Sequence, residues 1–199
     1  MKILLVDNYD SFVYNVVGLL EQCRATTPLL RWDVVRNDEV TPEMTAYYDA
    51  VILSPGPGIP AEAGRLAEVV AACIGSRPLL GICLGCQAIA EAFGLRLRQL
   101  EAPRHGHASN LRDVDAVDPV VGFLAGEEST VGRYHSWVID DVSFTPDTPL
   151  KVGARDKEGN VMSVYHPSLP VFGLQFHPES IITEQGLQML RNFLAVAEK

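Results

Sequence analysis

Short apolar runs alternate with segments of helical periodicity through the first half of the chain. Four of these runs predict buried strands, at residues 3–7, 32–36, 50–54 and 79–82. Other segments carry apolar residues three and four positions apart, which predicts helices after Asp10 or Ser11, at 61–75 and at 84–93. This alternation is typical of α/β proteins, in which helices cover both faces of a mostly parallel sheet.

The pattern changes beyond residue 95, where the strand-like segments become shorter and more polar. Turn signals such as Asp147-Thr148-Pro149 separate these segments, and we expect an antiparallel extension of the same sheet at 130–134, 161–165 and 171–176. The final apolar pattern predicts a helix from about Glu184 to Ala197. Because no repeat or long linker divides the chain, we predict one domain over residues 1–199.

Composition and charge restrict the class of protein. Hydrophobic residues make up 47% of the 199 positions, which is enough for a sizeable core without disulfides or metals. The net charge of −9 and the absence of a basic run argue against a nucleic acid partner. No apolar stretch approaches the roughly 18 residues of a membrane helix, and the first residues resemble a strand rather than a signal peptide. Four cysteines without a secretory signal suggest free thiols, so we expect a cytoplasmic protein.

A cysteine flanked by glycines stands where the fourth predicted strand gives way to a helix. In Gly81-Ile82-Cys83-Leu84-Gly85 the glycines lack the Cβ atoms that would clash in a sharp strand-to-helix turn. Such a turn is a nucleophile elbow, and the helix N-terminus favours the reactive thiolate. Cys83 is therefore a candidate nucleophile, and a buried cysteine at a glycine-rich strand end is the alternative.

A histidine and a glutamate at the end of the last predicted strand supply a candidate base. Pro178 favours an extended His177, and residues two apart in an extended segment point the same way, so Glu179 would orient the imidazole. The alternative is a strand end followed by a turn whose glutamate caps the last helix. Cys83 and His177 both follow strands, and the ends of parallel strands meet at one edge of a sheet.

The loop Pro55-Gly56-Pro57-Gly58 also follows a predicted strand. Its glycines leave backbone N–H groups that can approach a substrate closely. Gly56 together with the N–H of Leu84 would suit an oxyanion hole. A plain connecting turn is the alternative.

Taken together, the Cys83 motif, the PGPG loop and Gln175-Phe176-His177-Pro178-Glu179-Ser180 resemble the triad-type, class I glutamine amidotransferases. The segments 7–12, 53–58 and 132–136 further resemble the glutaminase subunit, component II, of anthranilate synthase and aminodeoxychorismate synthase. The resemblance extends from residue 1 to the end of the last helix. It implies a flavodoxin-like central sheet with an antiparallel extension.

The resemblance also implies a function and a set of site residues. Cys83 would attack the side-chain amide of L-glutamine, His177 and Glu179 would complete a triad, and ammonia would pass to a chorismate-using synthase subunit. Glutamine contacts would come from Gly56, Pro57, Gly58, Gln87, Ser136 and Trp137. We expect no metal or cofactor on this chain, and Mg²⁺ on the partner. Anthranilate synthase is the favoured partner, and aminodeoxychorismate synthase, or a glutaminase shared by both, is the alternative.

Departures from the family pattern leave other hypotheses open. His107 replaces the usual lysine of a His-Gly-Lys-x-Ser sequence, and Trp137 stands where relatives commonly have leucine. His105 and His107 are a metal-site hypothesis, for which a solvated loop is the alternative. Cys83 and Cys86 form a C-x-x-C pair, which suggests a dithiol redox centre or an inactivating disulfide. Another cysteine hydrolase and a catalytically silent binding subunit complete the alternatives.

Overall fold

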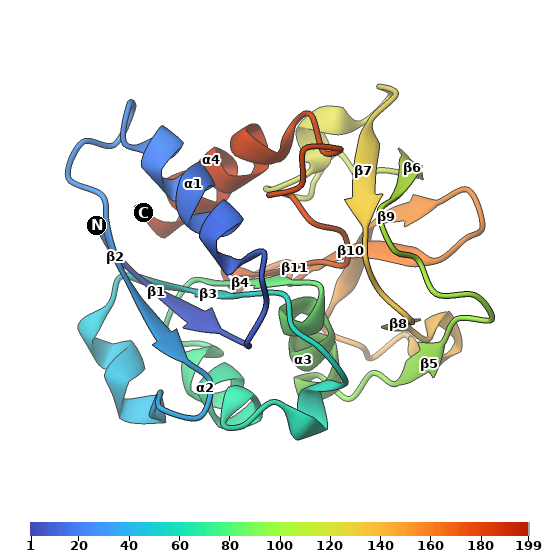
Figure 1. Cartoon of the computed structure of the whole chain (residues 1–199). Coiled ribbons are helices and arrows are strands. Elements are labelled where there is room, and N and C mark those ends of the chain that lie inside the picture. Colours follow the sequence, from blue (N-terminus) through green and yellow to red (C-terminus); the bar gives the residue numbers. More distant parts are fainter. Residues whose placement is uncertain (199) are drawn as a thin grey trace.

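The chain forms a large sheet with helices on both faces (Figure 1). The computed structural model describes residues 1–198. Its strands are β1 Lys2–Asp7, β2 Arg31–Arg36, β3 Ala50–Leu53, β4 Leu79–Ile82, β5 Leu97–Gln99, β6 His107–Arg112, β7 Thr130–Arg133, β8 Trp137–Ile139, β9 Lys151–Asp156, β10 Val161–Tyr165 and β11 Val171–Leu174. Its α-helices are α1 Val13–Cys23, α2 Leu66–Cys73, α3 Leu84–Ala92 and α4 Gly186–Ala197, and short 3-10 turns span Pro42–Tyr47, Pro60–Glu62, Gly122–Leu124 and Asp141–Ser143. The strand order is β2-β1-β3-β4-β11-β10-β9-β6-β7, with β5 and β8 as a separate pair.

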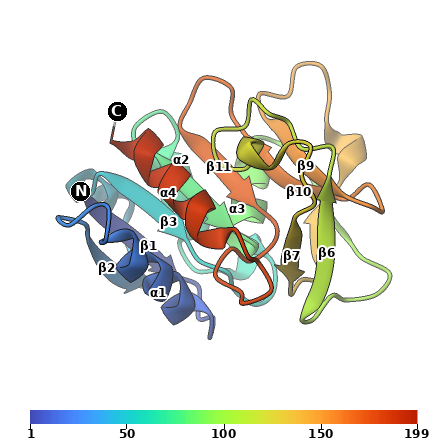
Figure 2. The ribbon, with the colours of Figure 1, turned by 90° about the horizontal axis from the view of Figure 1, so that it is seen from above.

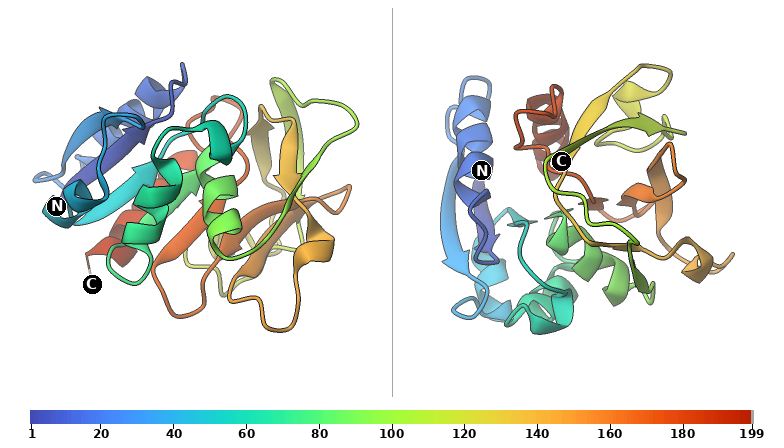
Figure 3. Two further views of the ribbon diagram at one scale, coloured as in Figure 1. Left: turned by 90° about the horizontal axis from the view of Figure 1, so that it is seen from below. Right: turned by 45° about the vertical axis from the view of Figure 1, so that its right-hand side comes forward.

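Alternating side chains of β1 build the two layers of the core. Ile3 and Leu5 pack with buried residues of α1 and α4, whereas Leu4 and Val6 pack with those of α2 and α3. Figure 2 shows α1 and α4 over one face of the sheet, and Figure 3 shows α2 and α3 over the other. All four side chains are fully buried, as the predicted doubly covered parallel sheet requires.

The antiparallel pairing predicted for the last strand is present on one side of that strand and absent on the other. β11 runs parallel to β4, with Val171 opposite Leu79 and Leu174 opposite Ile82. It runs antiparallel to β10, to which a short hairpin joins it. The parallel part of the sheet therefore extends from β2 to β11, and the antiparallel extension begins at β10.

The helix starts also differ from the predictions. α1 begins at Val13 without a side-chain cap, because Asp10 accepts the N–H of Phe12, at 2.7 Å, rather than one inside the helix. α2 begins at Leu66, after a separate 3-10 turn and a left-handed Gly64 with φ +55°. α4 begins at Gly186, two residues after the predicted start at Glu184.

The carboxyl ends of β1, β3, β4 and β11 meet at one edge of the sheet because these strands are parallel. The segments that follow them carry Asn8, the Gly56 loop, Cys83 and His177. Ligand sites of open α/β sheets form at such edges. Among residues 1–198, no helix has the length and apolar character needed to cross a membrane.

Candidate active site

Cys83 occupies the apex of a strained turn between β4 and α3. Its backbone has φ +51° and ψ −102°, outside the regions that residues with a side chain normally adopt. A Cβ atom on Gly81 would lie 2.4 Å from the carbonyl carbon of Gly85, and one on Gly85 would lie 2.6 Å from Cβ of Leu53. Both positions therefore require glycine, and the turn has the geometry of the predicted nucleophile elbow.

His177 and Glu179 meet across a turn and not along a strand. The Nδ1 atom of His177 lies 2.6 Å from Oε1 of Glu179, and both side chains are buried. The N–H of Ser180 donates to the carbonyl of His177, which closes a turn around Pro178. The expected shared face of an extended segment was wrong, and the turn brings the two side chains together instead.

The electrostatics of His177 favour its protonated form. Burial acts against a charged ring, but the neighbouring Cys83 and Glu179 outweigh this effect and raise the pKa of His177 to about 10. Its Nε2 atom is buried and has no hydrogen-bond partner among the residues described. A cysteine beside a charged imidazole and a carboxylate is the arrangement of an activated thiol nucleophile.

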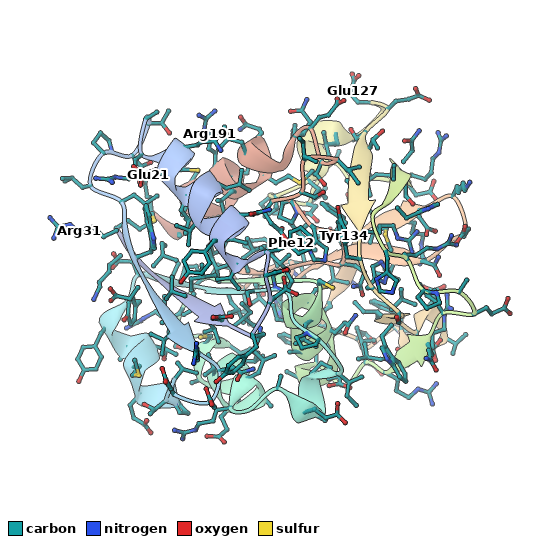
Figure 4. The ribbon with its side chains drawn as sticks, viewed as in Figure 1. Phe12, Glu21, Arg31, Glu127, Tyr134 and Arg191 are labelled. Atoms are coloured by element: carbon teal, nitrogen blue, oxygen red, sulfur yellow. The ribbon has the colours of Figure 1, made fainter. Side chains whose placement is uncertain are left out.

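Two aromatic rings hold the imidazole of His177 in place. The ring centroid of Tyr134 lies 4.9 Å from that of His177 and the centroid of Phe12 lies 5.5 Å from it, both edge to face. Phe12 and Tyr134 also pack on one another, and Figure 4 shows their side chains meeting between α1 and β7. The predictions assigned no active-site role to either ring, although both occur in segments that carried the family resemblance.

Gly56 packs directly against the elbow. A Cβ atom on Gly56 would lie 2.5 Å from Cδ2 of Leu84 and 2.6 Å from Cβ of Asn8. The buried Asn8 side chain donates to the carbonyl of Ser54 at 2.8 Å, and its N–H donates to the hydroxyl of Ser54. The two predicted oxyanion residues, Gly56 and Leu84, are thus neighbours. The hydrogen bonds between Asn8 and Ser54 support the start of the loop that carries Gly56.

A cavity of about 310 Å³ opens beside Cys83. It includes all six residues predicted to contact glutamine and the candidate nucleophile Cys83, together with Gln99, His105, Tyr134 and His135. The wall consists of Gly56, Pro57, Gly58, Cys83, Gln87, Gln99, His105, Tyr134, His135, Ser136 and Trp137. Leu84, His177 and Glu179 are buried and are not part of this wall.

Gln87 and Gln175 connect the pocket wall to Cys83. Its Nε2 atom donates to the carbonyl of Trp137 at 2.8 Å and to Oε1 of Gln175 at 3.2 Å. The Nε2 atom of Gln175 in turn lies 3.8 Å from Sγ of Cys83. In the sequence, Gln175 is one residue of the motif that contains His177 and Glu179, and no local pattern indicates its contact with Cys83.

The structure argues against a redox role for the C-x-x-C pair. Cys83 packs in the core layer of α1 and α4, whereas Cys86 packs in the layer of α2 and α3. Cys86 is fully buried, and burial raises the pKa of its thiol far above the ordinary value. A disulfide requires the two sulfur atoms to lie within bonding distance, whereas these two side chains pack in different core layers.

The metal-site hypothesis also lacks support. His105 lies at the pocket wall, and His107 begins β6 rather than lying in a loop, opposite Arg133 of β7. Among residues 1–198 there is no group of three or more His, Cys, Asp or Glu side chains that could hold an ion.

Comparisons with known proteins agree with this geometry. The family profile "Glutamine amidotransferase class-I" matches residues 4–197. Anthranilate synthase component 2 of Mycobacterium tuberculosis is 43% identical over 198 residues, which cover 98% of this chain and 82% of that protein. Anthranilate synthase component 2 of Lactococcus lactis is 40% identical, with coverages of 96% and 93%.

Solved structures give the same result for the fold. A protein assigned as one subunit of GMP synthase, from Thermoplasma acidophilum, superposes with a TM-score of 0.84 at 26% identity, covering all of this chain and 94% of that one. A glutamine amidotransferase from Thermotoga maritima superposes with a TM-score of 0.77 at 16% identity, with coverages of 99% and 97%, and supports the fold alone. The profile match and the relatives above 30% identity extend over nearly the whole chain, and the chain therefore belongs to the class-I glutamine amidotransferases.

Proposed function

We propose that this chain is the glutaminase subunit of a chorismate-using synthase, with Cys83, His177 and Glu179 as its catalytic residues. The observation that carries the proposal is the placement of Cys83 on a strained elbow, in the immediate field of a buried His177–Glu179 pair and at the wall of a pocket. The relatives named anthranilate synthase component 2 support the choice of synthase.

In the proposed reaction, the Cys83 thiolate attacks the side-chain amide carbon of L-glutamine. Negative charge then develops on the amide oxygen, and the N–H groups of Gly56 and Leu84 would stabilise it. The close approach of Gly56 to the Leu84 side chain supports these two candidates. The intermediate would collapse to a γ-glutamyl thioester.

His177 would move the protons in both half-reactions. As an imidazolium it donates a proton to the departing nitrogen, so ammonia leaves, and as a neutral ring it then takes a proton from the water that hydrolyses the thioester. Glu179, 2.6 Å from Nδ1, would hold the ring orientation and stabilise the charged form. The edge-to-face rings of Phe12 and Tyr134 support the same orientation.

A partner is part of the proposal because free ammonia is protonated in water at neutral pH and is then a poor nucleophile. The chain would pass ammonia to a synthase subunit that binds chorismate, where Mg²⁺ would be required. The proposed product is anthranilate, and aminodeoxychorismate is the competing outcome of the test below.

The test combines the purified chain with each candidate synthase, glutamine, Mg²⁺ and chorismate, and identifies the aromatic product. We expect anthranilate from glutamine with the wild-type chain, and none with Cys83→Ser, while ammonia supplied as a salt restores product in both. Aminodeoxychorismate as the main product would assign the chain to aminodeoxychorismate synthase instead. Full glutamine-dependent activity of Cys83→Ser would contradict the proposed mechanism.

A further inference from the structure

A buried polar chain leads from the end of β9 to the pocket wall. Nη1 of Arg133 lies 2.5 Å from Oδ2 of Asp156, and both side chains are 1% exposed. Asp156 also accepts the backbone N–H groups of Glu158 and Asn160, so its position is fixed by the turn after β9. The Nε atom of Arg133 lies 3.1 Å from Nε2 of His135. Along the chain, β7 continues through His135 into the segment that enters β8 (Figure 1).

These contacts determine the tautomer of His135. A guanidinium group donates hydrogen bonds and cannot accept them, so Nε2 of His135 is the acceptor and carries no proton. The proton of the neutral ring is therefore on Nδ1, which donates to the carbonyl of Trp137 at 2.9 Å. Burial, together with the charge of Arg133, lowers the pKa of His135 to about 3, so the ring stays neutral at ordinary pH.

The backbone around Ser136 is oriented by hydrogen bonds on both sides. The carbonyl groups of His135 and Ser136 accept the N–H groups of Arg104 and Leu100, at 2.9 and 2.8 Å. Because residues 1–198 contain no cis peptide bond, the N–H groups of Ser136 and Trp137 point away from these partners. Ser136 and Trp137 both line the pocket, so this orientation decides which backbone groups a substrate meets.

The carbonyl of Trp137 accepts two side-chain hydrogen bonds. One bond comes from Nδ1 of His135, whose ring also bonds Arg133 of the ion pair. The other comes from Nε2 of Gln87, in the first turn of α3. No other side-chain donor to this carbonyl exists among the described residues. Loss of the His135 donor would leave the Trp137 carbonyl with Gln87 as its one side-chain donor among the described residues.

We propose that His135 is a positioning residue for the amidotransferase reaction: its Nδ1–H orients the Ser136–Trp137 backbone at the pocket wall and thereby sets the affinity for the substrate. The inference rests on the proposed function, in which this backbone binds L-glutamine. The Arg133–Asp156 pair acts through His135, because it selects the tautomer that can donate to Trp137.

Two variants of similar polarity distinguish a role in positioning the pocket backbone from a role limited to satisfying the buried Arg133. Asparagine carries its amide nitrogen where histidine carries Nδ1, so His135→Asn retains the donor to Trp137 and loses the acceptor for Arg133. Glutamine carries its amide group where histidine carries Nε2, so His135→Gln retains the acceptor for Arg133 and loses the donor to Trp137. A role limited to satisfying the buried arginine predicts that glutamine is the better replacement, whereas our proposal predicts that asparagine is.

The readout is protection of Cys83 from iodoacetamide by L-glutamine in the full-length chain, followed by mass spectrometry. Cys23, Cys73 and Cys86 are fully buried and serve as internal controls. Each variant is normalised to its own alkylation rate without glutamine, and its thermal midpoint is measured separately. We expect half-protection in His135→Asn within about threefold of the wild-type concentration, and in His135→Gln at a concentration at least about tenfold higher.

Equal protection in the two variants, or the reverse order, would overturn the positioning role while leaving the proposed function intact. A wild-type chain that glutamine fails to protect at any concentration would instead contradict the proposed function, and the inference with it. A midpoint that falls more in His135→Asn than in His135→Gln, with the expected order of protection, supports the separation of stability from substrate positioning.

Discussion

Replacing Asp156 with asparagine measures the cost of leaving the buried Arg133 guanidinium without its counter-charge. The substitution keeps the shape of the side chain but leaves the Arg133 guanidinium, 1% exposed, without a counter-charge. Breaking a buried pair in this way costs about 3–5 kcal/mol. In a chain of this length each kcal/mol lowers Tm by about 2–4 °C, so we expect a fall of about 6–20 °C.

A half-exposed ion pair in the same region provides the control. Nη2 of Arg104 lies 2.6 Å from Oε2 of Glu158, with side chains 23% and 39% exposed. Solvent screens such a pair, which contributes about 0–1 kcal/mol, so Glu158→Gln should lower Tm by at most about 4 °C. The assay is thermal unfolding at pH 7, followed by circular dichroism and repeated by urea titration.

The pH dependence of the same variant checks the electrostatic cause. Burial acts to raise the pKa of Asp156, but hydrogen bonds from Asn160 and the charge of Arg133 hold it below the ordinary value. A carboxyl group with a lowered pKa stabilises the fold above about pH 4, and this contribution is lost as the pH falls further. The Tm difference between wild type and Asp156→Asn should therefore shrink on acidification below about pH 4. Equal losses in Asp156→Asn and Glu158→Gln at pH 7, or a difference that grows in acid, would refute the reasoning.

Three further predictions concern the active site. Glu179→Gln should lower kcat of glutamine hydrolysis by about 10²–10⁴-fold with the fold retained, because His177 loses its orienting charge, and an unchanged kcat would exclude that role. Gly56→Ala should lower kcat by about 10²-fold or more, since its Cβ atom would displace the elbow contact at 2.5 Å, and a normal rate would remove Gly56 from the oxyanion site. Peroxide treatment should oxidise Cys83 without linking it to Cys86, and detection of that disulfide by mass spectrometry would restore the redox hypothesis.

Local patterns were sufficient where a segment's own residues decide its structure. The strand Leu79–Ile82 and the elbow at Cys83 follow from an apolar run and from glycines that alone fit the tight turn. The direction of β11 did not follow, because Val171–Leu174 is an apolar run that fits either direction. Its parallel pairing with β4 joins residues 92 positions apart, which no local pattern indicates.

The sequence determined the layered α/β class, the candidate nucleophile, and the residue types of the His177–Glu179 pair, because hydrophobic period and turn chemistry are local properties of a chain. The tertiary structure decided how these residues meet: His177 reaches Glu179 through a turn, Phe12 and Tyr134 enclose the imidazole, and Arg133 selects the tautomer of His135. These contacts join segments that are far apart in the chain and depend on distance, burial and proton position. None of these quantities is encoded in the spacing of residues along one strand or helix.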